Sequence, residues 1–161
     1  MIKALLSLFL CGCVGYANSV NSIDGYWRTV DDSTGQNKAV VHIVTTNQVT
    51  TGTVMGGYPV NGVAPHDLCT KCPSPFTNQP VTGMQILWGM TFNTRDNAYA
   101  GGKILDPDSG HVYHAMLIPI NNGQGLKVHG YIGLPIIGRT QMWYRLTPDE
   151  YAEVMKPYSQ S

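Results

Sequence analysis

Beyond about residue 25, the chain alternates between short segments rich in apolar side chains and short runs of turn residues. The apolar segments contain many β-branched, aromatic and methionine residues, which favour strands. Runs such as 32–35 and 106–110 combine Asp, Ser and Gly and indicate tight turns. The pattern predicts eight strands, over residues 25–30, 39–45, 48–55, 83–91, 99–105, 111–118, 125–132 and 136–146.

Short turns join most of these segments, and short connections place consecutive strands side by side in antiparallel order. The sequence therefore predicts an all-β fold, an eight-stranded antiparallel up-and-down barrel. A short helix is expected after the last strand, because the run 147–150 (Thr-Pro-Asp-Glu) has the capping-box pattern with Pro at the first helical position. This helix would extend to about Met155 and pack on the barrel wall.

The first and last predicted strands carry matching aromatic and cationic residues. The run 25–27 is Gly-Tyr-Trp and the run 143–145 is Trp-Tyr-Arg. This pair resembles the arrangement by which lipocalins close one end of the barrel. An indole can seal the floor, and a guanidinium stacked on it can donate to nearby carbonyl groups. Gly25, Trp27 and Arg145 are therefore expected to have structural roles, the alternative being an unremarkable strand Trp and a solvated Arg.

Several predicted strands are apolar on both faces, notably residues 84–90 and 115–118. The extra apolar residues would either line a cavity or pack against the long loop or the helix. Alternation places Met84, Ile86, Trp88 and Met90 on one face of their strand, and Val112, His114, Met116 and Ile118 on one face of theirs. Which face points inward stays open, and these residues could equally form ordinary core. The candidate ligand-binding residues are Met84, Trp88, Met90, Tyr113, His114, Met116 and Arg139.

One long irregular stretch, residues 56–82, holds five of the ten prolines. Together with Cys69 and Cys72, these prolines predict an ordered lid. Two close cysteines in an exported protein are usually oxidised, so a disulfide between Cys69 and Cys72 is expected. Two alternatives stay open, namely a metal site to which His66 contributes, and redox-active or free thiols.

The remaining polar motifs favour structural over catalytic roles. The run 106–110 (Asp-Pro-Asp-Ser-Gly) resembles part of a calcium loop, but it lacks the closing acidic residue and suits a tight turn. His114 and His129 could be cross-strand neighbours that bind a metal or exchange protons, yet no nucleophile motif accompanies them. We therefore expect no enzyme activity, no catalytic residue, no bound metal and no cofactor.

The start of the chain predicts export. Residues 1–17 have one early Lys, an apolar run and a small-x-small ending, which is typical of a signal peptide cleaved after Ala17. A single domain, residues 18–161, would remain in the periplasm or be secreted. The run 10–13 (Leu-Cys-Gly-Cys) also resembles a lipobox, and lipidation of Cys13 would tether the protein to a membrane.

The charge pattern narrows the choice of partners. Ten Lys and Arg residues balance ten Asp and Glu residues, and the basic residues are scattered singly. Without a basic groove, nucleic acid is not an expected partner. We expect a monomer or weak dimer whose partner is a small, hydrophobic, lipid-like ligand.

Stretches along nearly the whole predicted domain resemble a known bacterial family. They are residues 25–32, 69–72, 81–88, 102–113, 126–133 and 138–145, and they resemble the secreted family of unknown function numbered 2147. The resemblance implies a lipocalin-like barrel, exported to the periplasm or beyond, that carries small hydrophobic ligands without established catalysis. One departure is His129, where the family pattern tends to have Arg, so a role that depends on a second positive charge there does not carry over.

Three functions follow from these expectations. The leading one is an exported lipocalin-like protein that binds or carries a small hydrophobic or amphipathic ligand. The second is an envelope structural or interaction protein with a filled barrel and no ligand. A continuous apolar cavity of a few hundred cubic ångströms, on the order of known ligand sites, would favour the first over the second. The third, a hydrolase or metal-dependent enzyme, would need His and Asp side chains that converge in one pocket.

Overall fold

The computed structural model describes residues 22–160. The expected signal peptide, its cleavage point at Ala17 and the alternative lipidation site at Cys13 lie outside the described residues. The elements are β1 (Gly25–Val30), β2 (Asn37–Thr46), β3 (Val49–Gly57), β4 (Gln85–Asn93), β5 (Ala98–Ala100), β6 (Lys103–Leu105), β7 (Val112–Ile120), η1 (Asn121–Gly123), β8 (Gly125–Tyr131), β9 (Gly138–Arg145), α1 (Pro148–Met155) and η2 (Lys156–Gln160).

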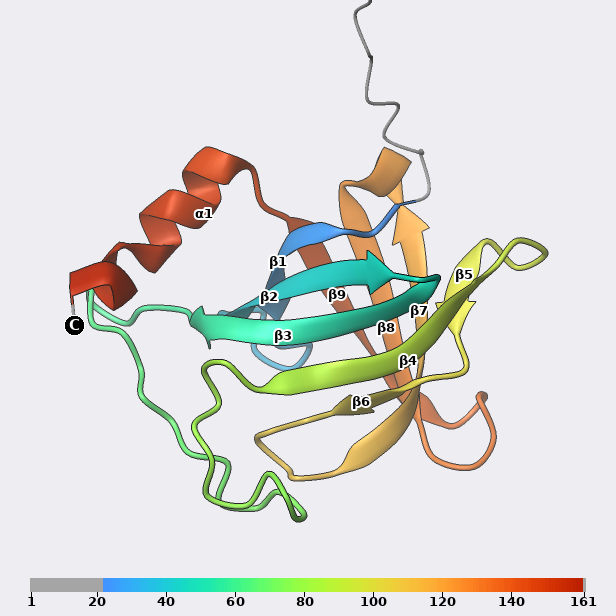
Figure 1. Ribbon diagram of the computed structural model, residues 1–161, viewed down its shortest axis with the longest axis horizontal. Coiled ribbons are helices and arrows are strands. Elements are labelled where there is room, and N and C mark those ends of the chain that lie inside the picture. Colours follow the sequence, from blue (N-terminus) through green and yellow to red (C-terminus); the bar gives the residue numbers. More distant parts are fainter. Residues whose placement is uncertain (1–21, 161) are drawn as a thin grey trace, which may run out of the picture.

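The strands form one closed antiparallel sheet (Figure 1). Consecutive strands pair from β1 to β4 and from β7 to β9, and β1 pairs with β9, so the first and last strands meet. β5 and β6 together bridge β4 to β7. The prediction of an eight-stranded up-and-down barrel is confirmed, and seven predicted strands end within two residues of the observed bounds.

The predicted strand over residues 99–105 is wrong in one respect, because it is broken into β5 and β6. The break falls at Gly101 and Gly102, and Gly101 has a positive φ of 84°. A Cβ atom on Gly102 would lie 2.2 Å from the Trp88 carbonyl oxygen, so the backbones of two strands approach too closely there for a side chain. Since β5 and β6 lie between the same two neighbours, the barrel still counts eight strand positions.

The predicted helix is confirmed as α1, and its capping box is complete. Thr147 accepts from the backbone N–H of Glu150, whose carboxylate accepts from the backbone N–H of Thr147 at 2.8 Å. Tyr151 of α1 stacks on Tyr26 of β1 with ring centroids 3.8 Å apart. The helix therefore contacts β1 through Tyr151, and it stands beside the barrel (Figure 1). None of the helical segments within residues 22–160 has the length and apolar character of a membrane-spanning helix.

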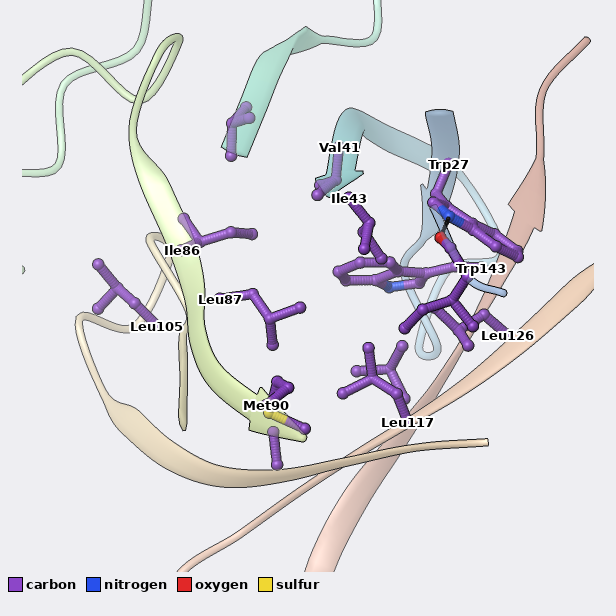
Figure 2. Close-up of a cluster of buried hydrophobic side chains, with 14 of the residues drawn as sticks. Trp27, Val41, Ile43, Ile86, Leu87, Met90, Leu105, Leu117, Leu126 and Trp143 are labelled. Carbon is purple, nitrogen blue, oxygen red and sulfur yellow. Dashed lines mark hydrogen bonds between the residues drawn. The ribbon is translucent and has the colours of Figure 1, made fainter. Parts of the chain in front are cut away.

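One half of the barrel interior is filled by a dense apolar core (Figure 2). Its largest members are less than 2% exposed and come from six strands: Trp27, Ile43, Leu87, Met90, Leu117, Leu126 and Trp143. The Trp27 indole donates to the carbonyl oxygen of Ile23 at 2.8 Å. These large side chains lie toward the end of the barrel where β1 begins and β9 ends, and smaller members of the cluster, such as Val41 and Val128, continue toward the other end.

Arg145 seals this end from outside the core. Its guanidinium lies over the Trp27 ring, 4.4 Å from the centroid, and its three nitrogens donate to the carbonyl oxygens of Gly123, Asp24 and Ser22 at 2.6, 2.6 and 2.9 Å. Burial lowers the pKa of Arg145. Gly25 has a φ of 130°, and a Cβ atom there would lie 2.8 Å from the guanidinium, so glycine leaves room for Arg145.

Candidate functional site

A cavity of about 610 Å³ occupies the other end of the barrel. It lies where β1, β3 and β8 end and where β2 and β9 begin, opposite the end closed by Arg145. Its apolar lining includes the buried side chains of Val41, Val54, Ile86, Leu105, Val128 and Trp143, and polar side chains contribute the rest. Valine side chains on β2, β3 and β8 supply part of this wall, whereas the bulkier Trp27, Leu87, Met90, Leu117 and Leu126 lie in the closed half.

Trp143 forms the boundary between the two halves. It belongs to the core cluster and also lines the cavity (Figure 2). Its indole N–H donates to the side-chain oxygen of Gln141 at 3.2 Å, and Gln141 lines the cavity as well. The inner part of the cavity therefore presents an aromatic wall with one amide beside it.

The rim of the cavity is charged, and two of its cations are paired with aspartates. The Nε atom of Arg139 donates to Asp32 at 2.6 Å, and Asp31 lies 3.8 Å from the same guanidinium. Lys38 donates to Asp108 at 2.5 Å. The hydrogen bond from Arg139 lowers the pKa of Asp32, and the hydrogen bond to Asp108 raises the pKa of Lys38. Both pairs are charged at neutral pH, and Asp67, Lys71 and Asp106 also line the cavity.

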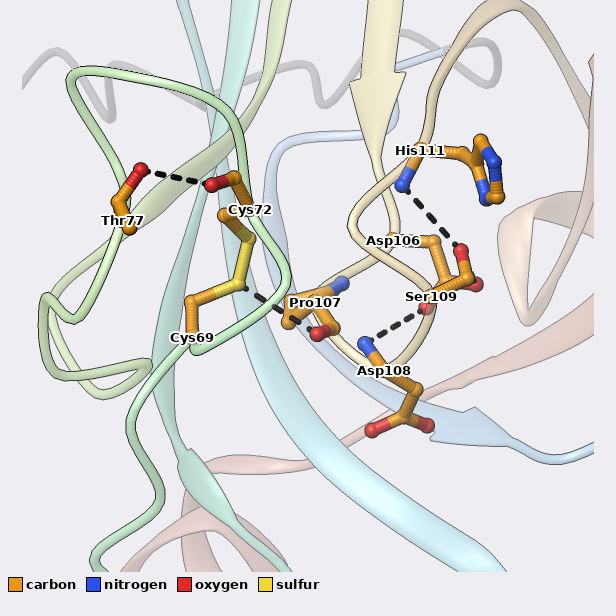
Figure 3. Close-up of a disulfide and its surroundings, with 8 residues drawn as sticks. All are labelled: Cys69, Cys72, Thr77, Asp106, Pro107, Asp108, Ser109 and His111. Carbon is orange, nitrogen blue, oxygen red and sulfur yellow. Dashed lines mark hydrogen bonds between the residues drawn. A yellow bond between two sulfur atoms is a disulfide. The ribbon is translucent and has the colours of Figure 1, made fainter.

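The loop of residues 58–84, which we call the lid, contributes part of the rim. Cys69 and Cys72 form a disulfide, as predicted, so their sulfur atoms are not available to a metal (Figure 3). The loop around the disulfide is closed by hydrogen bonds, including one from the Thr77 hydroxyl to the Cys72 carbonyl oxygen at 2.7 Å. Leu68 and Lys71 of the lid line the cavity. The lid is therefore an ordered wall of the site.

The turn between β6 and β7 packs against the lid near the disulfide. The Cys69 sulfur lies 3.4 Å from the Pro107 carbonyl oxygen (Figure 3). Asp106 accepts from the backbone N–H of Asp108 at 3.1 Å and from the Ser109 hydroxyl at 2.7 Å. These bonds are those of a tight turn, as expected in preference to a calcium loop. Within residues 22–160, no three His, Cys, Asp or Glu side chains are grouped to hold a metal.

Replacing Gly110 by alanine is expected to separate the lid from this turn. Gly110 has a φ of 75°, and a Cβ atom there would lie 2.0 Å from the Lys71 carbonyl oxygen. The clash is with backbone, so the lid must move. Gly35→Ala is the matched control, because Gly35 has a φ of 71° with no atom within 4 Å of the added carbon.

We expect G110A to increase amide hydrogen exchange in residues 66–72 by at least about tenfold, since local opening becomes easier there. G35A carries the same backbone strain, of order 1 kcal/mol, without a clash, and should leave exchange in the lid unchanged. Equal exchange in the lid of both variants would show that the turn does not hold the lid.

The seven candidate ligand-binding residues do not gather in one place. Tyr113 and Arg139 line the cavity. Met84 and Met90 are 6% and 0% exposed and belong to the apolar core. Arg139 is committed to Asp32 and Asp31, so an anionic ligand group would compete with two carboxylates for it.

Trp88 is separated from Met90 by a backbone irregularity. The predicted alternation along residues 84–90 is wrong, because Gly89 has a φ of 70° and the pairing with β5 and β6 is interrupted there. Met90 points into the core, whereas Trp88 pairs with the exposed Lys103 and packs on Phe76 of the lid, with ring centroids 6.1 Å apart. Trp88 therefore supports the lid from outside the barrel.

His114 and Met116 lie on the outer face of β7. The inward residues of this strand are Ala115 and Leu117, which are 1% and 0% exposed. His114 stacks on Tyr131 of β8 with ring centroids 5.5 Å apart, and Tyr131 stacks on His129 at 5.8 Å. The two histidines are thus on one outer face with a tyrosine between them, and neither lines the cavity.

The sequence prediction missed most of the cavity wall. Val41, Val54, Leu105 and Val128 are aliphatic residues in strands that were predicted correctly or nearly so. Of these, only Val128 lies between two polar residues, and even a clean alternation does not distinguish a packed position from one that borders empty volume. Gln141 and Trp143 share their strand face with Arg139 and Arg145, and this face does point inward.

Comparisons with known proteins agree with the architecture. Protein HP1028 from the human pathogen Helicobacter pylori, described as belonging to the lipocalin family, matches with a TM-score of 0.68 and 19% sequence identity, over 83% of this chain and 88% of that chain. At that identity the likeness concerns the fold, and it confirms a lipocalin-like barrel. No match is found among curated proteins. A family model matches residues 25–145, and the chain therefore belongs to the family described as uncharacterized proteins conserved in bacteria, DUF2147.

Proposed function

We propose that this protein binds a small hydrophobic or amphipathic ligand in the cavity between the lid and Trp143. The cavity of about 610 Å³ is the observation that carries the proposal. Sites for small molecules typically have about 300–1,000 Å³ and mostly apolar walls with a few polar groups. A protein that used its barrel only as a support for a partner would not need this volume.

The paired charges of the rim suggest which kind of ligand would bind. Arg139 is engaged with Asp32 and Lys38 with Asp108, and the other charged residues of the lining, Lys71, Asp67 and Asp106, include both signs. Displacing either pair to bind a carboxylate would leave an aspartate without its partner. A ligand with an uncharged polar end would disturb neither pair, so a long-chain alcohol should bind more tightly than the fatty acid of equal length.

We place this function in the periplasm or outside the cell. The disulfide between Cys69 and Cys72 supports this location, because such bonds persist in oxidising compartments. N-terminal sequencing of the protein from its own cell envelope should begin at Asn18. A chain that retains Met1 and is found in the cytoplasm would contradict export.

Filling the cavity tests the binding proposal directly. Ile104 lines the cavity and is paired with Tyr113, so a tryptophan at position 104 would occupy the volume. We expect Ile104→Trp to weaken binding of the neutral fluorophore N-phenylnaphthylamine by at least about tenfold, since the volume needed by an apolar ligand is lost. Its free energy of unfolding should stay within about 1 kcal/mol of the parent, because the ring enters a void.

Met116→Trp is the matched control, because Met116 lies on the outer face of a neighbouring strand. This variant should bind the fluorophore like the parent. Loss of binding in M116W with retention in I104W would place the ligand on the outer face, where His114 and Met116 lie. A parent protein that binds no apolar probe and releases no ligand in native mass spectrometry would favour the partner-binding alternative.

A further inference from the structure

The exposed apolar side chains of the protein are concentrated at the cavity end. Within residues 22–160, every large apolar side chain reported as more than half exposed lies on the lid or on the loop between β8 and β9. They are Val60, Val63, Leu68, Ile132, Leu134, Ile136 and Ile137. Large apolar side chains exposed together on a surface mark a contact with another molecule or with a membrane.

The loop of residues 132–137, which we call the β8–β9 loop, carries four of them. Ile136 and Ile137 are 88% and 70% exposed, and no residue from 130 to 138 is charged. Figure 1 shows this loop as the orange-red turn that extends beyond β8 and β9. Its base adjoins the cavity. Gly130 pairs with Arg139 next to the final residue pair of β8 and β9, and both residues line the cavity.

Some of the polar backbone groups of the loop have partners within the chain. Pro135 has no N–H, and its carbonyl oxygen accepts from Nε2 of His129 at 2.7 Å. The backbone N–H of Ile137 donates to the Leu134 carbonyl oxygen at 3.0 Å. On the other side of the ring, Nδ1 of His129 is 2.8 Å from the Thr140 hydroxyl. In hydrocarbon, each unsatisfied backbone group costs several kcal/mol, so internal pairing of this kind is what entry into lipid requires.

We propose that the β8–β9 loop inserts into the surface of a lipid bilayer and holds the cavity end of the barrel against the membrane. This inference goes beyond the proposed ligand binding, since it depends on the loop and can fail while the cavity still binds a ligand. The ligand's route between bilayer and cavity would then be short, because the loop and the cavity share a wall at Gly130 and Arg139.

A lipid surface suits this loop better than a protein partner does. Stable protein interfaces use about 20–30 residues on each side, whereas the exposed tip has six residues on a narrow turn. A bilayer needs no matching shape and accepts any uncharged apolar tip. Tyr131 lies at the base of the loop, and tyrosine side chains favour the depth of the lipid headgroups.

Flotation with phosphatidylcholine vesicles tests this proposal on the whole chain. The parent should float with the vesicles, and added salt should not release it, because the contact is apolar rather than ionic. The double substitution Ile136→Ser and Ile137→Ser should weaken vesicle binding by at least about tenfold, given the apolar surface it removes. Both side chains are exposed, so folding should be unaffected.

The matched control is the double substitution Val44→Ser and Val49→Ser. These two side chains are 39% and 41% exposed and lie at the closed end of the barrel, where β2 ends and β3 begins. The control should float like the parent, and both double variants should bind N-phenylnaphthylamine in solution like the parent.

Three results would overturn the proposal. The parent could fail to float, or the loop variant could float as well as the parent. The third result is that both double variants lose binding to the vesicles equally. Sedimentation equilibrium adds a fourth test. A dimer of the parent that dissociates in the loop variant, without flotation of either, would assign the β8–β9 loop to contact between two copies of the chain.

Discussion

Replacing Trp27 by alanine is expected to lower the free energy of unfolding by about 3–5 kcal/mol, the usual cost of removing a fully buried large aromatic side chain. Trp27 is 0% exposed, and its ring is covered by the Arg145 guanidinium. The substitution leaves a void in the closed half of the barrel. It also removes the indole N–H that donates to the Ile23 carbonyl oxygen. Urea denaturation followed by circular dichroism measures the change.

Trp88→Ala is the matched control. Trp88 is partly exposed on the outer face and packs on Phe76 of the lid. Because only part of its surface is buried, we expect a cost of about 1–2 kcal/mol. If W27A were no more destabilised than W88A, the Trp27 indole would not be what seals the closed end.

The closed end and the helix are the parts of the fold that the sequence predicts best. The helix rests on a local rule, and the closed end rests on the pairing of the first and last strands. Thr147 and Glu150 satisfy each other's backbone N–H groups only at a helix start, and both bonds are present. Trp27 and Arg145 meet because the first and last strands pair in a register that places them opposite one another.

Backbone irregularities limit the prediction of strand faces. Gly89 and Gly101 both adopt positive φ, which breaks the alternation in β4 and divides the next strand into β5 and β6. A glycine within a strand pattern is compatible with a regular strand, a bulge or a break, and the choice depends on how closely another backbone approaches. The close approach of Gly102 to the Trp88 carbonyl group is a contact between two paired strands, and it depends on their register rather than on the residues next to each glycine.

The cavity lies beyond sequence prediction for a different reason. Met84, Trp88 and Met90 suggest a ligand site because methionine and tryptophan are large and adaptable. In the folded barrel, large side chains such as Met90 fill space, and the open volume remains where Val41, Val54 and Val128 face one another. An empty volume depends on the sum of side-chain sizes across several strands, so a list of apolar residues along one strand does not locate it.

Replacing Arg145 by methionine is expected to lower the free energy of unfolding by about 2–4 kcal/mol, because hydrogen bonds from a charged donor are worth more than those from a neutral one. Methionine preserves much of the apolar contact with Trp27 but donates no hydrogen bond. The carbonyl groups of Ser22, Asp24 and Gly123 would each lose a guanidinium donor. The variant Arg145→Lys should restore little of the lost stability. A single ammonium group cannot reach the three carbonyl oxygens that the three nitrogens of the guanidinium reach.

Arg139→Met is the matched control, because Arg139 lies on the same strand and the same strand face at the other end of the barrel. Its side chain is 53% exposed and pairs with Asp32 and Asp31 on the surface. An exposed pair of this kind contributes about 0.2–1 kcal/mol, so R139M should be clearly more stable than R145M in urea denaturation. Equal stability of the two variants would mean that the closed end does not depend on Arg145.

The double variant of Trp27→Ala with Arg145→Met determines whether the two residues act as one unit. Arg145 is held in place partly by the indole beneath it, 4.4 Å from the guanidinium carbon to the ring centroid. Once Trp27 is gone, Arg145 should lose part of its own contribution, so the double variant should cost at least about 1 kcal/mol less than the two single costs added together. Additive costs would show that the indole fills the core and the guanidinium binds its three carbonyl groups independently. In either case the cavity end should keep its fluorophore affinity per folded molecule, because Trp143 and its neighbours form the cavity wall without contributions from Arg145.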